Sequence, residues 1–223
     1  MGASFGPRQL VLALDHAVSF ARDDFLSGPS NEAALGLIAR WPDWPSRVMA
    51  LVGPHGSGKS HLAAIWAETS GARVLSAKLL SETDLPAAFA TGALVVEDIA
   101  PDGLDERALF HLLNLAREQE AFVLLTARSA LSGFRVGIRD LASRLRAVPA
   151  VVLAPPDDTL LRSLIVKVAS DRQLAVDEAL VNYVATRIER SFEAAHAAVA
   201  RLDEEAMRQH RPVTRALASE LFR

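Results

Sequence analysis

Short apolar runs alternate with helical patterns through the first two thirds of the chain. The strand candidates are Val48–Val52, Arg73–Ser76, Leu94–Val96, Ala121–Thr126 and Val148–Ala154. Between them lie segments with apolar residues three and four positions apart, the spacing of a helix with one buried face. Because strands that alternate with helices are typical of a parallel sheet, the sequence predicts an α/β fold with five strands.

Only helical patterns follow Pro155-Pro156. They cover Asp158–Arg172, Asp177–Ile188, Phe192–His210 and a short segment after Val213. We therefore expect three parts: a tail over residues 1–20, an α/β domain over 21–156 and a small helical domain over 157–223.

A phosphate-binding loop follows the first apolar run. Residues 53–60 read Gly-Pro-His-Gly-Ser-Gly-Lys-Ser, the pattern G-x-x-x-x-G-K-[ST]. Its glycines let backbone N–H groups turn toward an anion, and the next helix presents its positive N-terminus. Lys59 can reach terminal phosphates and the Ser60 hydroxyl can hold Mg²⁺, so we expect ATP or ADP with Mg²⁺. The loop candidates are Pro54, His55, Gly56, Ser57, Gly58, Lys59 and Ser60.

Polar residues end two of the strand candidates. Glu97 and Asp98 follow residues 94–96, where one carboxylate can bind Mg²⁺ through water and the other can orient or deprotonate an attacking water. With Ser60, Glu97 is the metal candidate, although the residues leave open which acid takes which role. Thr126 ends the next strand candidate and can touch the γ-phosphate or the water. Solvated strand ends are the alternative for all three.

Arg144 lies in the segment Asp140–Arg146, just before the last strand candidate. An arginine at this place can leave its own subunit's site and stabilise transition-state charge on a neighbour's nucleotide. The alternative is a surface arginine paired with Asp140 one helical turn away.

Composition narrows the partners and the compartment. The net charge is −3, with 24 basic against 27 acidic residues, so we expect no strong direct binding to DNA. The chain has no cysteine, which excludes disulfides and suits a reducing cytoplasm. No apolar run approaches 18 residues and the first twenty lack a secretory pattern, so we expect a cytoplasmic protein without a membrane segment.

Four segments together resemble the AAA+ module of the bacterial DnaA family. They are Asp24-Phe25-Leu26 with Gly28-Pro29-Ser30-Asn31, residues 53–63, Val96-Glu97-Asp98-Ile99 and Leu141–Leu145. Within the family the chain is most similar to the short regulators of the Hda type, which inactivate DnaA. The resemblance implies an AAA+ P-loop module, with its five-stranded parallel sheet flanked by helices, and a small C-terminal all-helical lid.

The same resemblance implies a function. It is negative regulation of DNA replication initiation, in which the protein stimulates hydrolysis of the ATP bound to DnaA and Arg144 acts in trans. Carried over by position, Asp24, Phe25, Leu26 and Asn31 would lie near the adenine and ribose, and residues 56–62, with His61, around the phosphates. We also expect no helix-turn-helix domain of an initiator. Contact between two copies is compatible with AAA+ geometry, so a homodimer stays open.

This sequence departs from the family at two places. Relatives carry an arginine on the lid helix, the second sensor, which contacts the nucleotide. The register places Glu193 at that position, and Arg190, about one turn earlier, is the candidate for this contact. Relatives also have an acidic residue close after the threonine of Thr126-Ala127-Arg128. Both departures favour weak hydrolysis at the chain's own site.

The tail carries a candidate docking peptide. Residues 9–14 read Gln-Leu-Val-Leu-Ala-Leu and are similar to the hexapeptide with which Hda-type proteins bind the DNA polymerase sliding clamp. Gln9 would supply amide hydrogen bonds, and Leu10, Leu12 and Leu14 apolar anchors. An ordinary edge strand or helix start is the alternative.

Two other functions are compatible with a phosphate loop. A self-contained ATPase, such as a helicase-loader-like or remodelling factor, would hydrolyse its own ATP with Glu97, Asp98 and Thr126. The negative charge and the lack of an evident aromatic and basic channel disfavour contact with single-stranded DNA. A small-molecule kinase is disfavoured by Ser143-Arg144 and by the terminal helices.

Overall fold

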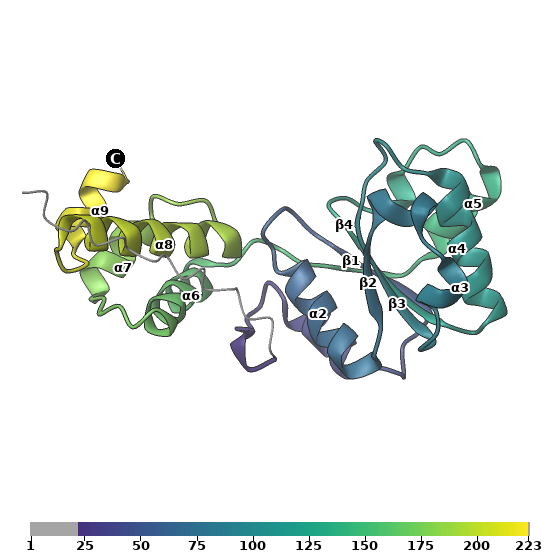
Figure 1. Ribbon diagram of the computed structural model, residues 1–223, viewed down its shortest axis with the longest axis horizontal. Coiled ribbons are helices and arrows are strands. Elements are labelled where there is room, and N and C mark those ends of the chain that lie inside the picture. Colours follow the sequence, from purple (N-terminus) through teal and green to yellow (C-terminus); the bar gives the residue numbers. More distant parts are fainter. Residues whose placement is uncertain (1–21, 223) are drawn as a thin grey trace, which may run out of the picture.

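The computed structural model describes residues 22–222, and its centre is a five-stranded parallel sheet (Figure 1). The strand order is β2-β3-β4-β1-β5, so the strand that carries the acidic pair pairs with the strand that carries Thr126. The predicted five-stranded parallel sheet is confirmed. The strands are β1 (Val48–Val52), β2 (Arg73–Ser76), β3 (Ala93–Ile99), β4 (Phe122–Ala127) and β5 (Ala150–Val152).

Helices connect the strands and follow the last one. Several begin where a side chain accepts a hydrogen bond from the backbone N–H three residues further on, as Asp105, Asp157, Asp177, Ser191 and Thr214 do. The α-helices are α1 (Glu32–Ala39), α2 (Lys59–Ser70), α3 (Leu85–Ala88), α4 (Glu106–Glu118), α5 (Arg139–Ala147), α6 (Asp158–Asp171), α7 (Glu178–Ala185), α8 (Phe192–Gln209) and α9 (Arg215–Leu221); the 3₁₀ turns are η1 (Arg22–Asp24), η2 (Ala77–Glu82) and η3 (Leu131–Gly133).

Both faces of the three central strands, β1, β3 and β4, are buried, and alternate residues of each strand point to opposite sides. In β1, Met49 and Leu51 pack with residues of α1 and α2, whereas Ala50 and Val52 pack with residues of α3, α4 and α5. Figure 1 shows α2 on one side of the sheet and α3, α4 and α5 on the other. This double burial explains why the strand sequences are continuous apolar runs.

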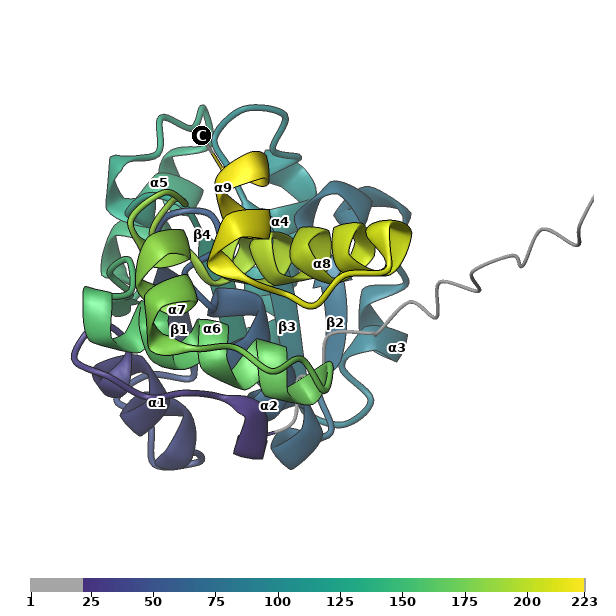
Figure 2. The same cartoon turned by 90° about the vertical axis from the view of Figure 1, so that its left-hand side faces the viewer.

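Helices α6 to α9 form a separate group with a core of their own, and Figure 2 shows them in front of the sheet. The Nζ atom of Lys167 on α6 lies 2.7 Å from Oδ1 of Asp24, which ties this group to the segment before α1. The C-terminal helical lid is thus confirmed. Within residues 22–222, no helix is long and apolar enough to cross a membrane.

Some predicted boundaries were wrong. The last strand covers Ala150–Val152 and not residues 148–154, because Val148 caps the end of α5 and the residue pairing with β1 ends at Val152. The third strand runs on to Ile99 through an irregularity in its pairing between Val96 and Ile99. The short helices η2 and α3 were not predicted, since four to six residues show no helical period.

The end of β1 is tightly packed, and this can be tested. A Cβ atom on Gly53 would lie 2.6 Å from the carbonyl oxygen of Leu153, so Gly53→Ala is expected to lower the free energy of unfolding by about 1–3 kcal/mol. Gly133→Ala is the control, because nothing lies within 4 Å of a Cβ there. Urea unfolding measures both, and equal midpoints would contradict the proposed packing.

Candidate functional site

The phosphate loop joins the carboxyl end of β1 to α2. The Gly53 N–H donates to the carbonyl oxygen of Ala127 at 3.1 Å, which holds the start of the loop beside the end of β4. The Lys59 side chain is 7% exposed and folds back under the loop. Its Nζ atom donates to the carbonyl oxygens of Gly53 at 2.9 Å and Pro54 at 2.7 Å. The loop is therefore shaped by the ammonium group that is expected to meet phosphate.

Burial lowers the pKa of Lys59 below its usual range, and the carboxylates of Asp98 and Glu97 oppose that shift. The charge of Arg128 lowers the pKa further. The first turn of α2 adds backbone N–H groups that have no partner within the helix. An anion at this place would receive hydrogen bonds from both sources.

The acidic pair occupies the irregular part of β3. Asp98 has a φ of 57°, a left-handed conformation rare for a residue other than glycine, and its N–H donates to Oγ1 of Thr126 at 3.0 Å. This turn places Asp98 in the wall of the cavity at the phosphate loop. The Thr126 side chain is buried, so it fixes the backbone of Asp98 from the neighbouring strand.

The residues present fit a magnesium ion. The Oε1 atom of Glu97 is buried and has no hydrogen-bond partner within residues 22–222, as expected of a carboxylate that faces a cation or its water shell. Ser60 follows Lys59 in the first turn of α2. The described residues contain no group of three or more typical metal ligands. Mg²⁺ needs only one or two carboxylates, because phosphate oxygens and waters complete its shell.

A cavity of about 300 Å³ lies over the loop and is closed on one side by the lid. Its walls are His55, Gly56, Ser57, Gly58, Lys59, Ser60, His61 and Asp98, with Phe192, Glu193 and His196 from α8. The structure thus brings together the predicted residues from His55 to His61 and one of the two acids, whereas Pro54 and Glu97 are not among the residues that line this cavity. Phe192 and His196 were not predicted as site residues, because the helical period of α8 accounts for both positions without a ligand.

Direct contacts join the lid to the loop. The Phe192 N–H donates to the carbonyl oxygen of Gly56 at 2.8 Å, and Nδ1 of His55 lies 2.8 Å from Oε2 of Glu193. Gly56 has a φ of 65°, and a Cβ atom there would lie 2.8 Å from Cβ of Ser191. Glu193, at the position where the resemblance predicts a second-sensor arginine, therefore touches the loop.

Arg190 is turned elsewhere. Its Nη2 atom lies 2.6 Å from Oδ1 of Asp158, and both side chains are exposed. Arg190 is not among the residues that line the cavity over the loop. Its contact with a nucleotide stays a prediction.

The segment expected near the adenine lies beside this cavity. The Phe25 ring is buried, with its centroid 5.2 Å from that of His61 and 6.3 Å from that of Phe192, which stacks on it. A hollow of only about 40 Å³ lies among these rings and His196, which suffices for water and not for a purine. A base can therefore enter only if the Phe192 or His196 side chain moves.

Asn31 holds the loop before α1. Its Oδ1 accepts from the Gly28 N–H at 2.9 Å, and its Nδ2 donates to the carbonyl oxygen of Leu26 at 3.0 Å. Leu26 itself packs against the core of the lid. These two predicted nucleotide contacts thus have structural roles in addition to any ligand role.

Comparison with known proteins rests on structure. No family model and no curated protein matches the sequence. Domain III of the Thermotoga maritima replication initiation protein DnaA superposes with a TM-score of 0.70 at 18% identity, over 89% of this chain and 93% of that one. AMPPCP-bound DnaA from Aquifex aeolicus gives 0.67 at 15% identity, over 84% and 68%. The Thermotoga maritima RuvB Holliday junction branch migration motor gives 0.68 at 20% identity, over 91% and 70%.

This chain has the fold of an AAA+ module. The likeness covers the sheet and the C-terminal helices together, since it spans most of the chain. At these identities it establishes the fold and leaves the chemistry to the residues themselves.

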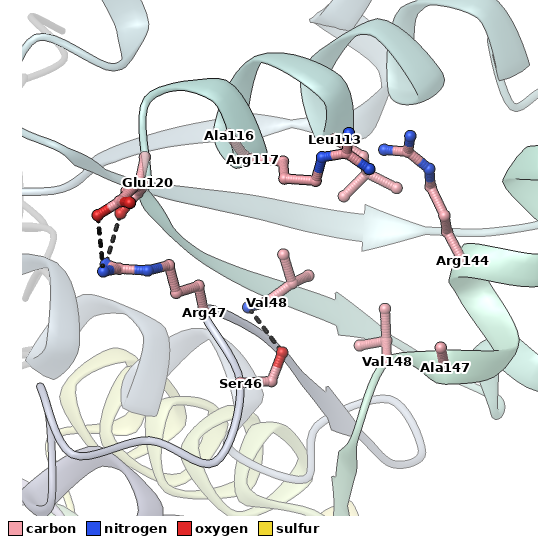
Figure 3. Close-up of a pocket in the computed structure, with 11 residues that line it drawn as sticks. Ser46, Arg47, Val48, Leu113, Ala116, Arg117, Glu120, Arg144, Ala147 and Val148 are labelled. Carbon is pink, nitrogen blue, oxygen red and sulfur yellow. Dashed lines mark hydrogen bonds and ion pairs between the residues drawn. The ribbon is translucent and has the colours of Figure 1, made fainter.

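In this fold, Arg144 lies away from the phosphate loop. It is half-buried on α5, with its Cζ atom 5.1 Å from the ring centroid of Phe110. It lines a second cavity that includes Val48, the first residue of β1, whereas the phosphate loop follows the last residue of β1 (Figure 3). Arg144 is therefore at the other end of the sheet from Lys59. The remaining predicted residues, Gln9, Leu10, Leu12 and Leu14, lie outside the described residues.

The half-buried position of His196 predicts a pH dependence. Burial lowers its pKa below 6.5, and the charge of Arg172 lowers it further, so the unfolded chain binds this proton more readily than the folded one. The folded state is then favoured in full above pH 6.5 and loses stability as the pH falls toward the lowered pKa. We expect His196→Gln to have a shallower fall in the free energy of unfolding between pH 7 and 5 than wild type, measured by urea unfolding. Identical slopes would show that His196 is not buried as described.

Proposed function

We propose that this protein binds ATP or ADP with Mg²⁺ at its phosphate loop and is a cytoplasmic negative regulator of DNA replication initiation of the Hda type. In this proposal it stimulates the hydrolysis of ATP bound to DnaA. Residues 9–14 hold it to the DNA polymerase sliding clamp.

The observation that carries the proposal is the separation of Arg144 from the chain's own phosphate loop. An arginine that acted on its own nucleotide would have to line the cavity that contains Lys59. Arg144 lines the cavity at the opposite end of the sheet, where a partner can approach it. A cation of this kind stabilises charge on a nucleotide that another subunit presents.

Nucleotide binding rests on the loop itself. The Lys59 ammonium and the free N–H groups at the start of α2 would hold the phosphates, and Ser60 with Glu97 would hold Mg²⁺. The bound ion would neutralise charge on the phosphates. A DnaA structure of the same fold contains AMPPCP, which supports a nucleotide at the corresponding place. The loop and the lid are joined by the contact of His55 with Glu193 and by the hydrogen bond from the Phe192 N–H to Gly56. A nucleotide bound to the loop would therefore also affect the position of the lid.

A self-contained ATPase is the second candidate. It is supported by Asp98, which lines the loop cavity and has its backbone fixed by Thr126, so a carboxylate is held where it can orient water. The Glu193 side chain at the second-sensor position argues for slow hydrolysis there, because a carboxylate cannot stabilise phosphate charge.

Nucleotide binding can be tested with two of the three lysines. Lys59→Ala is expected to weaken ATP binding at least a hundredfold, because the cation aimed at the terminal phosphates is lost. Lys78→Ala, on the exposed surface of η2, is the matched control and should bind as wild type does. Isothermal titration with Mg²⁺-ATP measures both. Equal affinity of the two variants would contradict a phosphate role for Lys59.

The regulatory role can be tested on DnaA preloaded with radiolabelled ATP, with and without DNA-loaded clamp. Wild type is expected to speed hydrolysis with the clamp, and Arg144→Ala to lose at least 10³-fold of that stimulation, because the trans cation is missing. A Gln9→Ala/Leu10→Ala variant should lose the stimulation that the DNA-loaded clamp adds and keep the rate that wild type shows without the clamp. Arg146→Ala, an exposed arginine two residues away, is the control and should act as wild type does. No stimulation by wild type, or full activity of Arg144→Ala, would refute the proposal.

A further inference from the structure

A cavity of about 440 Å³ opens at the end of the sheet that is remote from the phosphate loop (Figure 3). Its floor consists of small and branched apolar side chains at the starts of β1 and β4 and on α4. Charged side chains from three elements stand at its rim: Arg47 before β1, Arg117 and Glu120 at the end of α4, and Arg144 on α5.

The charges at this rim do not balance. The Arg47 Nη2 atom lies 3.2 Å from Oε2 of Glu120, so this cation already has an anionic partner. Within residues 22–222, neither the Arg117 nor the Arg144 side chain has an ion pair or hydrogen bond, although their backbone carbonyl oxygens accept hydrogen bonds at the helix ends. Two guanidinium groups thus border one cavity without a carboxylate of their own, since Glu120 is paired with Arg47, in a chain whose net charge is −3.

The two groups also face each other. Figure 3 shows the Arg117 and Arg144 side chains extended toward one another beside Leu113. The Phe110 ring under the Arg144 guanidinium limits its orientations. Like charges repel, and this arrangement gains stability when an anion lies between them. The apolar floor strengthens the attraction, because it excludes water from one side.

We propose that Arg117 is a second catalytic cation, which together with Arg144 clamps the terminal phosphates of the nucleotide that the partner presents. This inference rests on the proposed function, since the ligand is the partner's ATP. The two arginines would meet that phosphate group from α4 and α5, so that negative charge enters between them. Neither the phosphate-loop pattern nor the Ser143-Arg144 pattern includes Arg117.

The two arginines would act on the negative charge that moves during hydrolysis. A water oxygen bonds to the γ-phosphorus, the bond from that phosphorus to the bridging oxygen breaks, and ADP and inorganic phosphate leave while the water's proton passes to the phosphate or to solvent. Negative charge builds on the bridging and γ-oxygens. One guanidinium can face each set of oxygens, and bidentate geometry favours arginine over lysine at both places.

The test uses the full chain, DNA-loaded clamp and DnaA preloaded with ATP. Arg117→Ala is expected to lower the maximal stimulated rate, measured at saturating protein, by about 10–100-fold, with little change in the concentration that gives half-maximal stimulation. Arg117→Lys should recover part of the rate, because the charge returns without the fork. Arg107→Ala, an exposed arginine on the same helix outside the cavity, is the control and should match wild type.

The outcomes separate the two hypotheses. If wild type stimulates and Arg144→Ala does not, but Arg117→Ala keeps the full maximal rate, the catalytic role of Arg117 is refuted and the proposed function stands. A raised half-maximal concentration at an unchanged maximal rate would also refute it, because Arg117 would then only bind the partner protein. If wild type itself fails to stimulate hydrolysis, the proposed function is refuted, and so is the catalytic role of Arg117 that rests on it. Unfolding midpoints of all variants exclude loss of folding as the cause.

Discussion

The buried ammonium of Lys59 constrains the phosphate-binding end of this molecule. An ammonium group taken out of water needs hydrogen-bond acceptors for its N–H groups. Here the carbonyl oxygens of Gly53 and Pro54 are two of these acceptors. Those carbonyls belong to the loop, so the loop is wrapped around the charge that it presents. Phosphate can take up the same ammonium only by replacing these hydrogen bonds. Either the Lys59 side chain turns away from these carbonyls or the loop shifts when a phosphate takes their place.

A shift of the loop would reach the lid, because hydrogen bonds join the two parts. Gly56 accepts a hydrogen bond from the Phe192 N–H, and no other residue fits there beside Ser191 with the observed φ. The same stretch of α8 supplies Phe192 and His196 to the space where a base is expected. Movement of the loop and entry of a base thus act on one segment of the lid. This coupling follows from packing and does not require hydrolysis at this site.

The sequence predicted the sheet well and the site in part. Strands Val48–Val52 and Arg73–Ser76 came out with the expected ends, since turn residues bound their apolar runs. The position of Asp98 was beyond prediction, because a left-handed φ at an aspartate depends on the Thr126 hydroxyl of the adjacent strand. Phe192 and His196 reach the loop through lid packing, more than 130 residues along the chain, and no local pattern records such a contact.

The sheet separates two places with different charge requirements. At its carboxyl end, Lys59 lies near Asp98 and Glu97, so positive and negative groups are matched and a phosphate needs a metal ion to enter without excess charge. At the other end, Arg117 and Arg144 have no carboxylate between them, and an anion can enter alone. In the proposed function, a nucleotide at the first place is held with its counterion, whereas the second place meets charge that develops on a nucleotide held by another protein. The proposed ligands of the two ends therefore differ. The end with Lys59 would hold a resident Mg²⁺-nucleotide, and the end with Arg117 and Arg144 would bind the transition state of hydrolysis on another protein.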